Sequence, residues 1–202
     1  MTKVLEHFKK NDPKLWKVAI KLGKIEPYRV RSSGDYFADL CESIVNQQLS
    51  GRAAATIWER FIALLPQNKV TPANVLKVAG QQMRDAGMSW AKARYVKDLA
   101  LKVKDKTVQL DQLDKLSDQE VTAELIKVKG IGVWTAEMFL MFTLARPDIF
   151  SHGDLGLHNA ICNIYGLKNP TREQVETLSL RWSPYRSIAC RILWKSLEKI
   201  DS

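Results

Sequence analysis

The chain has 202 residues, of which 46% are hydrophobic and 26% are charged, and it contains three cysteines. This composition is typical of a folded globular protein and excludes a disordered, fibrous or disulfide-stapled one. Lysine and arginine outnumber aspartate and glutamate by 31 to 22, and the resulting net charge of +9 favours a polyanionic partner such as nucleic acid.

Apolar residues recur at helical spacing along nearly the whole chain, and strand-like alternation is almost absent. The first patterns run over residues 15–22, 37–45 and 54–65. Between the first two lies segment 24–35, the longest stretch without a helical period, which we interpret as a connector. Ser50 is expected to start the third helix.

Glycine and proline divide the rest of the chain into short helices. Gly87 and Gly166 are typical helix stops, whereas the segments Thr71-Pro72 and Asn169-Pro170-Thr171 are typical helix starts. We therefore predict an all-α protein of about ten short helices joined by short polar connections. No run of about 18 apolar residues indicates a membrane span, and the N-terminus lacks the apolar core of a secretory signal.

The segment 125–136, LIKVKGIGVWTA, joins two apolar helical patterns through a GxG turn, which predicts a helix-hairpin-helix. Two glycines let the backbone approach another surface closely, and the second helix begins with unpaired N–H groups that suit a phosphate. Gly130, Gly132 and Thr135 would then position DNA, while Lys127 and Lys129 supply charge. The alternative is an ordinary helix–helix turn, because glycine ends many helices.

Three motifs in order resemble the helix-hairpin-helix, Gly-Pro-rich-loop and aspartate (HhH-GPD) superfamily of DNA glycosylases. They are SIVNQQLSGRAA at 43–54, LIKVKGIGVWTAEMFLMF at 125–142 and FSHGDLGLHNAI at 150–161. The first motif is similar to the 3-methyladenine DNA glycosylase II family. The resemblance implies two helical lobes around a central cleft: a lobe of residues 1–40 with 150–202, and a central bundle of 41–149.

The resemblance places the catalytic carboxylate at Asp154, about twenty residues beyond the hairpin. A carboxylate there would offset the positive charge of the sugar as the N-glycosidic bond breaks, and would orient water. The alternative is that Asp154 caps a helix, since it precedes an apolar helical pattern, and both roles are compatible. Asp148 is a weaker candidate, and we interpret His152 as a surface or phosphate contact and His158 as a helix-face residue.

Superfamily members that also cut the strand carry a lysine two residues after the second hairpin glycine, where this chain has Trp134. We therefore expect base excision without lyase activity. The resemblance assigns Trp134, Met138 and Trp194 to the base pocket, where an indole face would stack on a cationic methylated purine. It also assigns Gln48 to the wedge that fills the gap left by an extruded base.

The resemblance further implies that the carbonyls of Ile126, Val128 and Gly130 hold a structural Na⁺ or K⁺ when DNA is bound. No other cofactor is expected, and three cysteines cannot hold an iron–sulfur cluster by a four-cysteine set. The remaining basic residues are interpreted as solvated helix faces. They are Arg29, Arg31, Arg52, Lys92, Arg94, Lys97, Arg172, Arg181, Arg186 and Arg191.

The predicted function is excision of alkylated bases, of the 3-methyladenine and 7-methylguanine type, from double-stranded DNA by a monomeric intracellular enzyme. Such an enzyme would work in the cytoplasm or nucleoid of a prokaryote, or in the nucleus of a eukaryote. Two alternatives stay open. One is a helix-hairpin-helix protein that binds DNA without catalysis, and the other is a glycosylase for another class of lesion.

Overall fold

The computed structural model describes residues 2–23, 35–49 and 51–198, and these residues form helices and no strands. The predicted all-α class is thus confirmed. The connector at 24–35, apart from Asp35, and the positions Ser50, Arg29 and Arg31 lie outside the described residues. Among the described residues, no helix is both long enough and apolar enough to span a bilayer.

The chain divides into two compact units. One is formed by both chain ends, Met1–Val30 with Leu140–Ser202, and the other by Arg31–Phe139. The division expected from the sequence placed the boundaries at 40/41 and 149/150.

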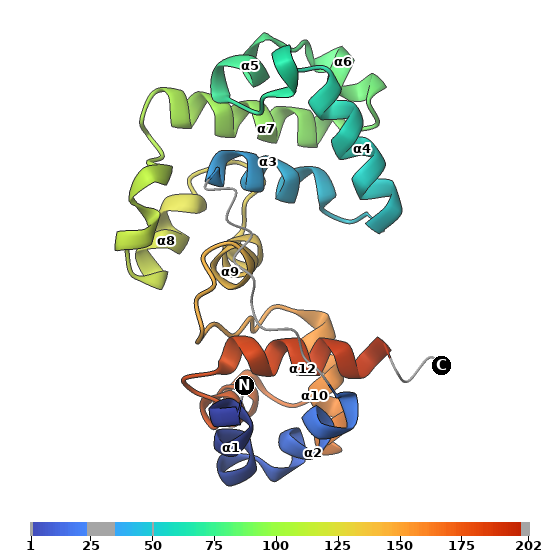
Figure 1. Cartoon of the computed structure of the whole chain (residues 1–202), viewed down its shortest axis with the longest axis vertical. Helices are drawn as coiled ribbons and strands as arrows, with labels where there is room; N and C mark the ends of the chain where they lie inside the picture. The colour runs from blue at the N-terminus through green and yellow to red at the C-terminus, as the bar shows by residue number, and fades with distance from the viewer. Residues whose placement is uncertain (1, 24–34, 50, 199–202) are drawn as a thin grey trace. The chain divides into compact units, whose positions relative to one another are not determined.

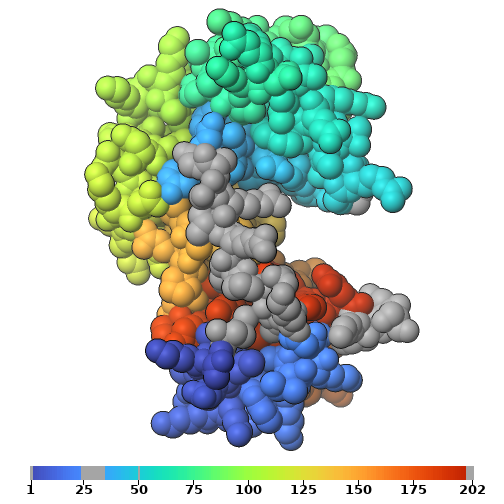
Figure 2. Space-filling view, viewed as in Figure 1, coloured from blue at the N-terminus to red at the C-terminus, as the bar shows by residue number. Residues whose placement is uncertain are grey.

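The unit formed by the chain ends is built on α12, which packs against α2 and α10, while α1 packs against α2 (Figure 1). The side chains of α1 and α2 form one continuous surface (Figure 2). Phe8, Leu15 and Leu193 are fully buried in its core. Its helices are α1 Thr2–Asn11, α2 Pro13–Leu22, α10 Leu155–Tyr165, α11 Arg172–Leu180 and α12 Arg186–Glu198.

A buried carboxylate ties the core of this unit together. Asp12 caps α2 by accepting a hydrogen bond from the Leu15 amide at 3.0 Å. Its second oxygen accepts hydrogen bonds from the Tyr165 hydroxyl at 2.5 Å and from Trp182 Nε1 at 2.8 Å. The pKa of Tyr165 is raised mainly by burial of its side chain and further by the hydrogen bond and charge of Asp12. A polar side chain is tolerated in this core because several donors form hydrogen bonds with it.

The unit of residues 31–139 is organised around α7, the longest of its helices, which packs against α3, α5 and α6 (Figure 1). Leu40, Phe61 and Leu99 are fully buried there. Its helices are α3 Tyr36–Asn46, α4 Gly51–Ala63, α5 Pro72–Lys77, α6 Gly80–Asp85, α7 Trp90–Lys104 and α8 Asp118–Leu125, with 3₁₀ turns at Pro66–Asn68 and Leu110–Lys115. Helix α9, Val133–Phe142, begins in this unit and ends in the other.

Candidate functional site

The turn after α3 carries Gln48, the predicted wedge. Helix α3 ends at Asn46, and Gln48 is exposed and adopts a left-handed φ of 57°. The ammonium group of Lys92 donates hydrogen bonds to the carbonyls of Val45 at 2.8 Å and Gln47 at 2.6 Å. This positive charge satisfies the last carbonyls of α3 and complements the negative end of its dipole. Burial lowers the pKa of Lys92.

The predicted hairpin lies between α8 and α9, which confirms that the GxG segment joins two helices. Gly130 has a left-handed φ of 86°, and a Cβ atom there would lie 2.1 Å from Cδ2 of the Tyr95 ring. At Gly132, a Cβ atom would have no neighbour within 4 Å. The first glycine is therefore required by packing inside the unit, whereas the second leaves open space at the N-terminus of α9.

Gln47 ties the turn to the hairpin. Its Nε2 donates a hydrogen bond to the Gly130 carbonyl at 2.9 Å and a longer one to Thr135 Oγ1 at 3.4 Å. Thr135 is only 4% exposed, so its hydroxyl serves this internal contact. What Thr135 can offer to DNA is its backbone N–H in the first turn of α9.

The two hairpin lysines have different surroundings. The amine of Lys127 lies 2.5 Å from a carboxylate oxygen of Glu124, so part of its charge is balanced within the unit. Lys129 is exposed, and its backbone N–H donates to Asp98 Oδ2 at 2.8 Å. Of the two, Lys129 is better placed to attract a phosphate.

The predicted cation ligands are backbone carbonyls of the hairpin. The Gly130 carbonyl accepts from Gln47, and the Val128 carbonyl accepts from the Ile131 amide at 3.1 Å. A carbonyl oxygen has two lone pairs, so these bonds leave each oxygen one further acceptor direction. Backbone carbonyl oxygens coordinate K⁺ in ion channels, so the donor chemistry of these two carbonyls suits the predicted monovalent ion. Separately, no group of three His, Cys, Asp or Glu side chains in the described ranges could hold a metal.

Asp154 is the N-cap of α10, as the sequence allowed. Its Oδ1 accepts hydrogen bonds from the Leu157 amide at 2.8 Å and from Trp194 Nε1 at 2.9 Å. The Trp194 ring also packs at a tilt against Phe142, with ring centroids 5.9 Å apart. The same oxygen thus caps a helix and is oriented by an indole.

A glycine makes this arrangement possible. A Cβ atom at Gly156 would lie 3.1 Å from both Asp154 Oδ1 and Trp194 Cδ1. That distance is tighter than ordinary van der Waals contact, so the hydrogen-bonded pair closes directly over the bare Cα atom. Trp194 was expected in the base pocket, and its indole N–H holds the candidate carboxylate.

The other predicted pocket residues belong to the unit of residues 31–139. Trp134 lies in the first turn of α9 and is 45% exposed, whereas Met138, one turn later, is partly buried. An indole with nearly half its surface exposed is not simply a core residue. These observations are compatible with the predicted stacking role.

Two polar residues near Asp154 have local structural partners. Asp148 pairs bidentately with Arg186, at 2.9 Å from Nε and 3.1 Å from Nη2, and accepts from the Ser183 hydroxyl at 2.8 Å. Burial alone would raise the pKa of Asp148, but these hydrogen bonds outweigh it and lower the pKa. The Nε2 atom of His152 contacts a carboxylate oxygen of Glu176, and burial lowers the pKa of the His152 ring. Arg186, expected on a solvated face, is therefore a structural ion-pair partner.

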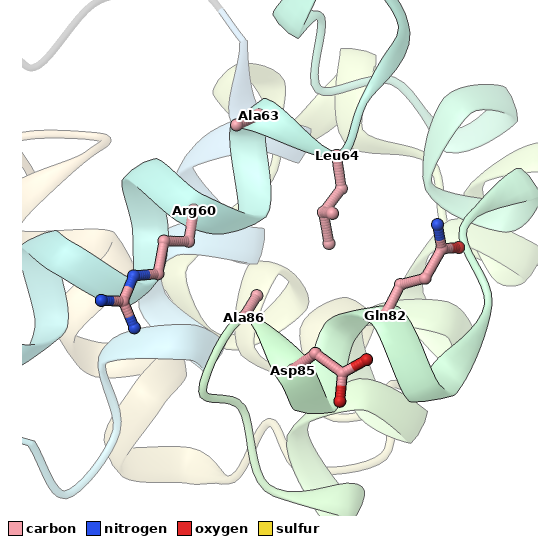
Figure 3. A pocket seen from close by; sticks show the side chains of 6 residues that line it. All are labelled: Arg60, Ala63, Leu64, Gln82, Asp85 and Ala86. Atoms are coloured by element: carbon pink, nitrogen blue, oxygen red, sulfur yellow. The ribbon is translucent and has the colours of Figure 1, made fainter.

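An open cavity of about 340 Å³ lies between α4 and α6 (Figure 3). Two of its polar residues are already engaged, because Gln82 accepts from the Ala79 amide and Asp85 from Gln81. None of the candidate site residues lines it. The cavity therefore lacks the convergent polar groups of a ligand site.

Comparisons with known proteins identify the family of this chain. The family model described as HhH-GPD superfamily base excision DNA repair protein matches residues 41–184. A putative DNA-3-methyladenine glycosylase of Bacillus subtilis is 34% identical over 81% of the chain, and the chain spans 60% of that relative. DNA-3-methyladenine glycosylase 1 of Schizosaccharomyces pombe is 30% identical over 92% of the chain and 83% of the relative.

A solved structure from the same yeast, of a 3-methyladenine DNA glycosylase in complex with abasic DNA, has a TM-score of 0.86 at 29% identity. It covers 99% of this chain, and the chain covers 98% of it.

Proposed function

Since the chain belongs to the HhH-GPD superfamily of base excision DNA repair proteins, we propose that it is a DNA glycosylase that removes alkylated bases from double-stranded DNA. The observation that carries the proposal is Asp154, held on one oxygen by the Leu157 amide and Trp194 Nε1. A carboxylate fixed in this way can stabilise the cationic sugar that forms as the glycosidic bond breaks, without moving during the reaction.

Alkylated purines of the 3-methyladenine and 7-methylguanine type suit this arrangement. Alkylation of a ring nitrogen makes the base a cationic leaving group, so no strong general acid is needed. The exposed Trp134 indole offers an electron-rich face to such a cation, a contact that contributes about 1–2 kcal/mol when desolvated. The relatives named as 3-methyladenine glycosylases support the same substrate class.

The DNA backbone would be held at the hairpin. The first N–H groups of α9 and the open space at Gly132 suit a phosphate oxygen, and the exposed Lys129 adds charge. When DNA is bound, the carbonyls of Ile126, Val128 and Gly130 would hold a monovalent ion that stabilises the turn. We propose that the protein acts as a monomer and without another cofactor.

We further propose that the enzyme is a monofunctional hydrolase without lyase activity. The position from which a lysine would form a Schiff base is occupied by Trp134, which has no amine. The nearby amine of Lys127 is paired with Glu124. Incubation of the purified protein with an abasic duplex at neutral pH should therefore leave the strand intact, and cleavage would contradict this part of the proposal.

The decisive variant is Asp154→Asn. Asparagine is a good N-cap, and its amide oxygen can accept both hydrogen bonds that Asp154 Oδ1 accepts, so the variant removes the charge and keeps the fold. Release of methylated bases from alkylated DNA, measured by mass spectrometry, should fall on the order of 100-fold or more. Binding to an abasic duplex should be retained.

Two results would decide against the proposal. If the wild-type protein releases no alkylated base, the substrate class is wrong. If Asp154→Asn is folded and as active as the wild type, another group supplies the catalytic charge.

A further inference from the structure

Four side chains on one face of α7 contact the candidate DNA-binding loops of the same unit. They recur at spacings of three or four residues, so they form one stripe along the helix. We call this set the α7 stripe; it consists of Lys92, Tyr95, Asp98 and Lys102.

The first member holds the turn that carries Gln48. The Lys92 ammonium group bridges two carbonyls at the end of α3, and the chain then enters the left-handed conformation at Gln48. A non-glycine residue keeps this conformation only where its surroundings fix it. Lys92 supplies that fixation from another helix.

The other three members each contact a different residue of the hairpin. The Tyr95 ring packs against Gly130, so closely that no side chain fits between them. Asp98 Oδ2 accepts from the Lys129 amide at 2.8 Å and from the Lys102 ammonium group at 2.8 Å. Lys102 in turn donates to the Lys127 carbonyl.

The charge of Asp98 strengthens its contacts with the hairpin. Burial alone would raise the pKa of Asp98, but hydrogen bonds from Lys102 and the Lys129 amide outweigh it and lower the pKa. Asp98 is therefore a charged acceptor at neutral pH, and charge-assisted hydrogen bonds are stronger than neutral ones. The hairpin backbone is thus anchored on both its N–H and C=O sides.

We propose that the α7 stripe positions the turn at Gln48 and the hairpin as one rigid body, and so couples backbone binding to base extrusion. The inference rests on the proposed glycosylase function and assigns positioning residues to it. Gln47 closes the arrangement, because it joins the turn directly to the Gly130 carbonyl. A wedge works only if it enters the duplex at a fixed distance from the bound phosphates. The α7 stripe fixes the distance between Gln48 and the hairpin that would bind those phosphates.

The test compares two substrates that differ in the cost of extrusion. Both are oligonucleotide duplexes with one 7-methylguanine; in one the lesion is paired, and in the other it lies in a short bubble of mismatches. Extruding a base costs least where it is already unpaired. A defect in wedge positioning should therefore slow excision from the paired duplex more than from the bubble.

The variant is Lys92→Met, which keeps the length of the side chain and removes both hydrogen bonds to the turn. Single-turnover excision from the paired duplex should fall about tenfold or more, as expected for the loss of hydrogen bonds from a charged donor. Excision from the bubble should fall less than about threefold, because little extrusion remains to be done. Lys92→Arg, which keeps a charged donor, should recover part of the rate.

Lys104→Met is the matched control, because Lys104 is an exposed lysine in the last turn of the same helix. It should leave both rates unchanged. If Lys92→Met proves unfolded in urea denaturation, Gln47→Met tests the other link between the turn and the hairpin, the hydrogen bond from its side chain to the Gly130 carbonyl. The same preference for the bubble is expected.

Equal losses on both substrates, or no loss on either, would overturn the inference. Failure of the wild-type protein to release 7-methylguanine from either substrate would instead refute the proposed function, so the two failures are distinguishable.

Discussion

Replacing Gly130 with alanine tests the hairpin at a point where two constraints meet. The residue has a φ of 86°, which costs a residue with a Cβ atom about 1–2 kcal/mol. The new Cβ atom would also lie 2.1 Å from Tyr95 Cδ2, whereas ordinary contact begins at 3.4 Å. The ring or the turn must therefore move by about 1.3 Å, the difference between the two distances.

Overpacking of this kind typically costs about 1–3 kcal/mol. Together with the backbone term, Gly130→Ala should lower the free energy of unfolding by about 2–5 kcal/mol. Urea denaturation followed by circular dichroism measures this change directly, provided that the slope of the transition is unchanged. In a Tyr95→Leu background the cost of the same substitution should shrink toward the backbone term alone.

Gly132→Ala is the matched control. Its Cβ atom would meet nothing within 4 Å and its φ is not positive, so stability should change by less than about 1 kcal/mol. The same Cβ atom would project into the space that the proposal gives to a phosphate, so affinity for an abasic duplex should fall severalfold. If Gly130→Ala unfolds with the wild-type free energy, or if both substitutions cost the same, the reasoning about the two glycines is wrong.

Two further predictions concern the unit formed by the chain ends. Trp194→Phe keeps an aromatic ring but removes the indole N–H that donates to Asp154, so single-turnover excision should fall about tenfold while affinity for an abasic duplex stays constant. Asp148→Asn removes the charge that pairs with Arg186 and should lower the free energy of unfolding at neutral pH by about 1–2 kcal/mol. Folding lowers the pKa of Asp148, so the stabilisation from its charge is present above the unfolded-state pKa and is lost as the pH falls through the folded-state pKa. If Asp148→Asn were still less stable than the wild type in urea titrations below that pH, the ion pair would not be the cause of the difference.

The parts of the fold that could be predicted from sequence are those that local chemistry decides. Thr71 caps α5 with proline in the next position, as the dipeptide indicated. Gly166 ends α10 in the left-handed conformation. The start near Asn169 was placed slightly early, because Thr171 is the residue whose hydroxyl accepts the Gln174 amide, and α11 begins after it.

The parts that sequence reasoning missed depend on contacts between distant segments. Lys92 was interpreted as a solvated lysine, which is wrong, because its ammonium group binds carbonyls more than forty residues away in the chain. Tyr95 and Asp98 attracted no interpretation, although their spacing from Lys92 places them on one helix face. The periodicity indicates a shared face, but only the fold shows that the face meets two backbone segments.

Asp154 is a different case, since local and distant contacts converge on one atom. The sequence indicated both a cap and a catalytic carboxylate, and it gave no reason to connect Trp194 with either. The structure shows that capping and orientation use the same oxygen, with Gly156 leaving room for both. Any substitution that deletes this oxygen therefore changes stability and catalysis together, which is why asparagine is the informative replacement.

Contacts of basic side chains inside the protein limit how much of the net charge of +9 is available to DNA. Several cations that contribute to the net charge of +9 are engaged within their own unit: Lys92 and Lys102 bind backbone carbonyls, and Lys127 and Arg186 pair with carboxylates. A cation that holds a carbonyl or a carboxylate in the folded protein is less available to a phosphate. The salt dependence of DNA affinity follows the number of phosphates neutralised and not the net charge. Under the proposed function, the basic residues thus act in two ways: exposed groups such as Lys129 attract phosphates, and partly buried groups such as Lys92 and Lys102 hold the candidate DNA-binding loops in place.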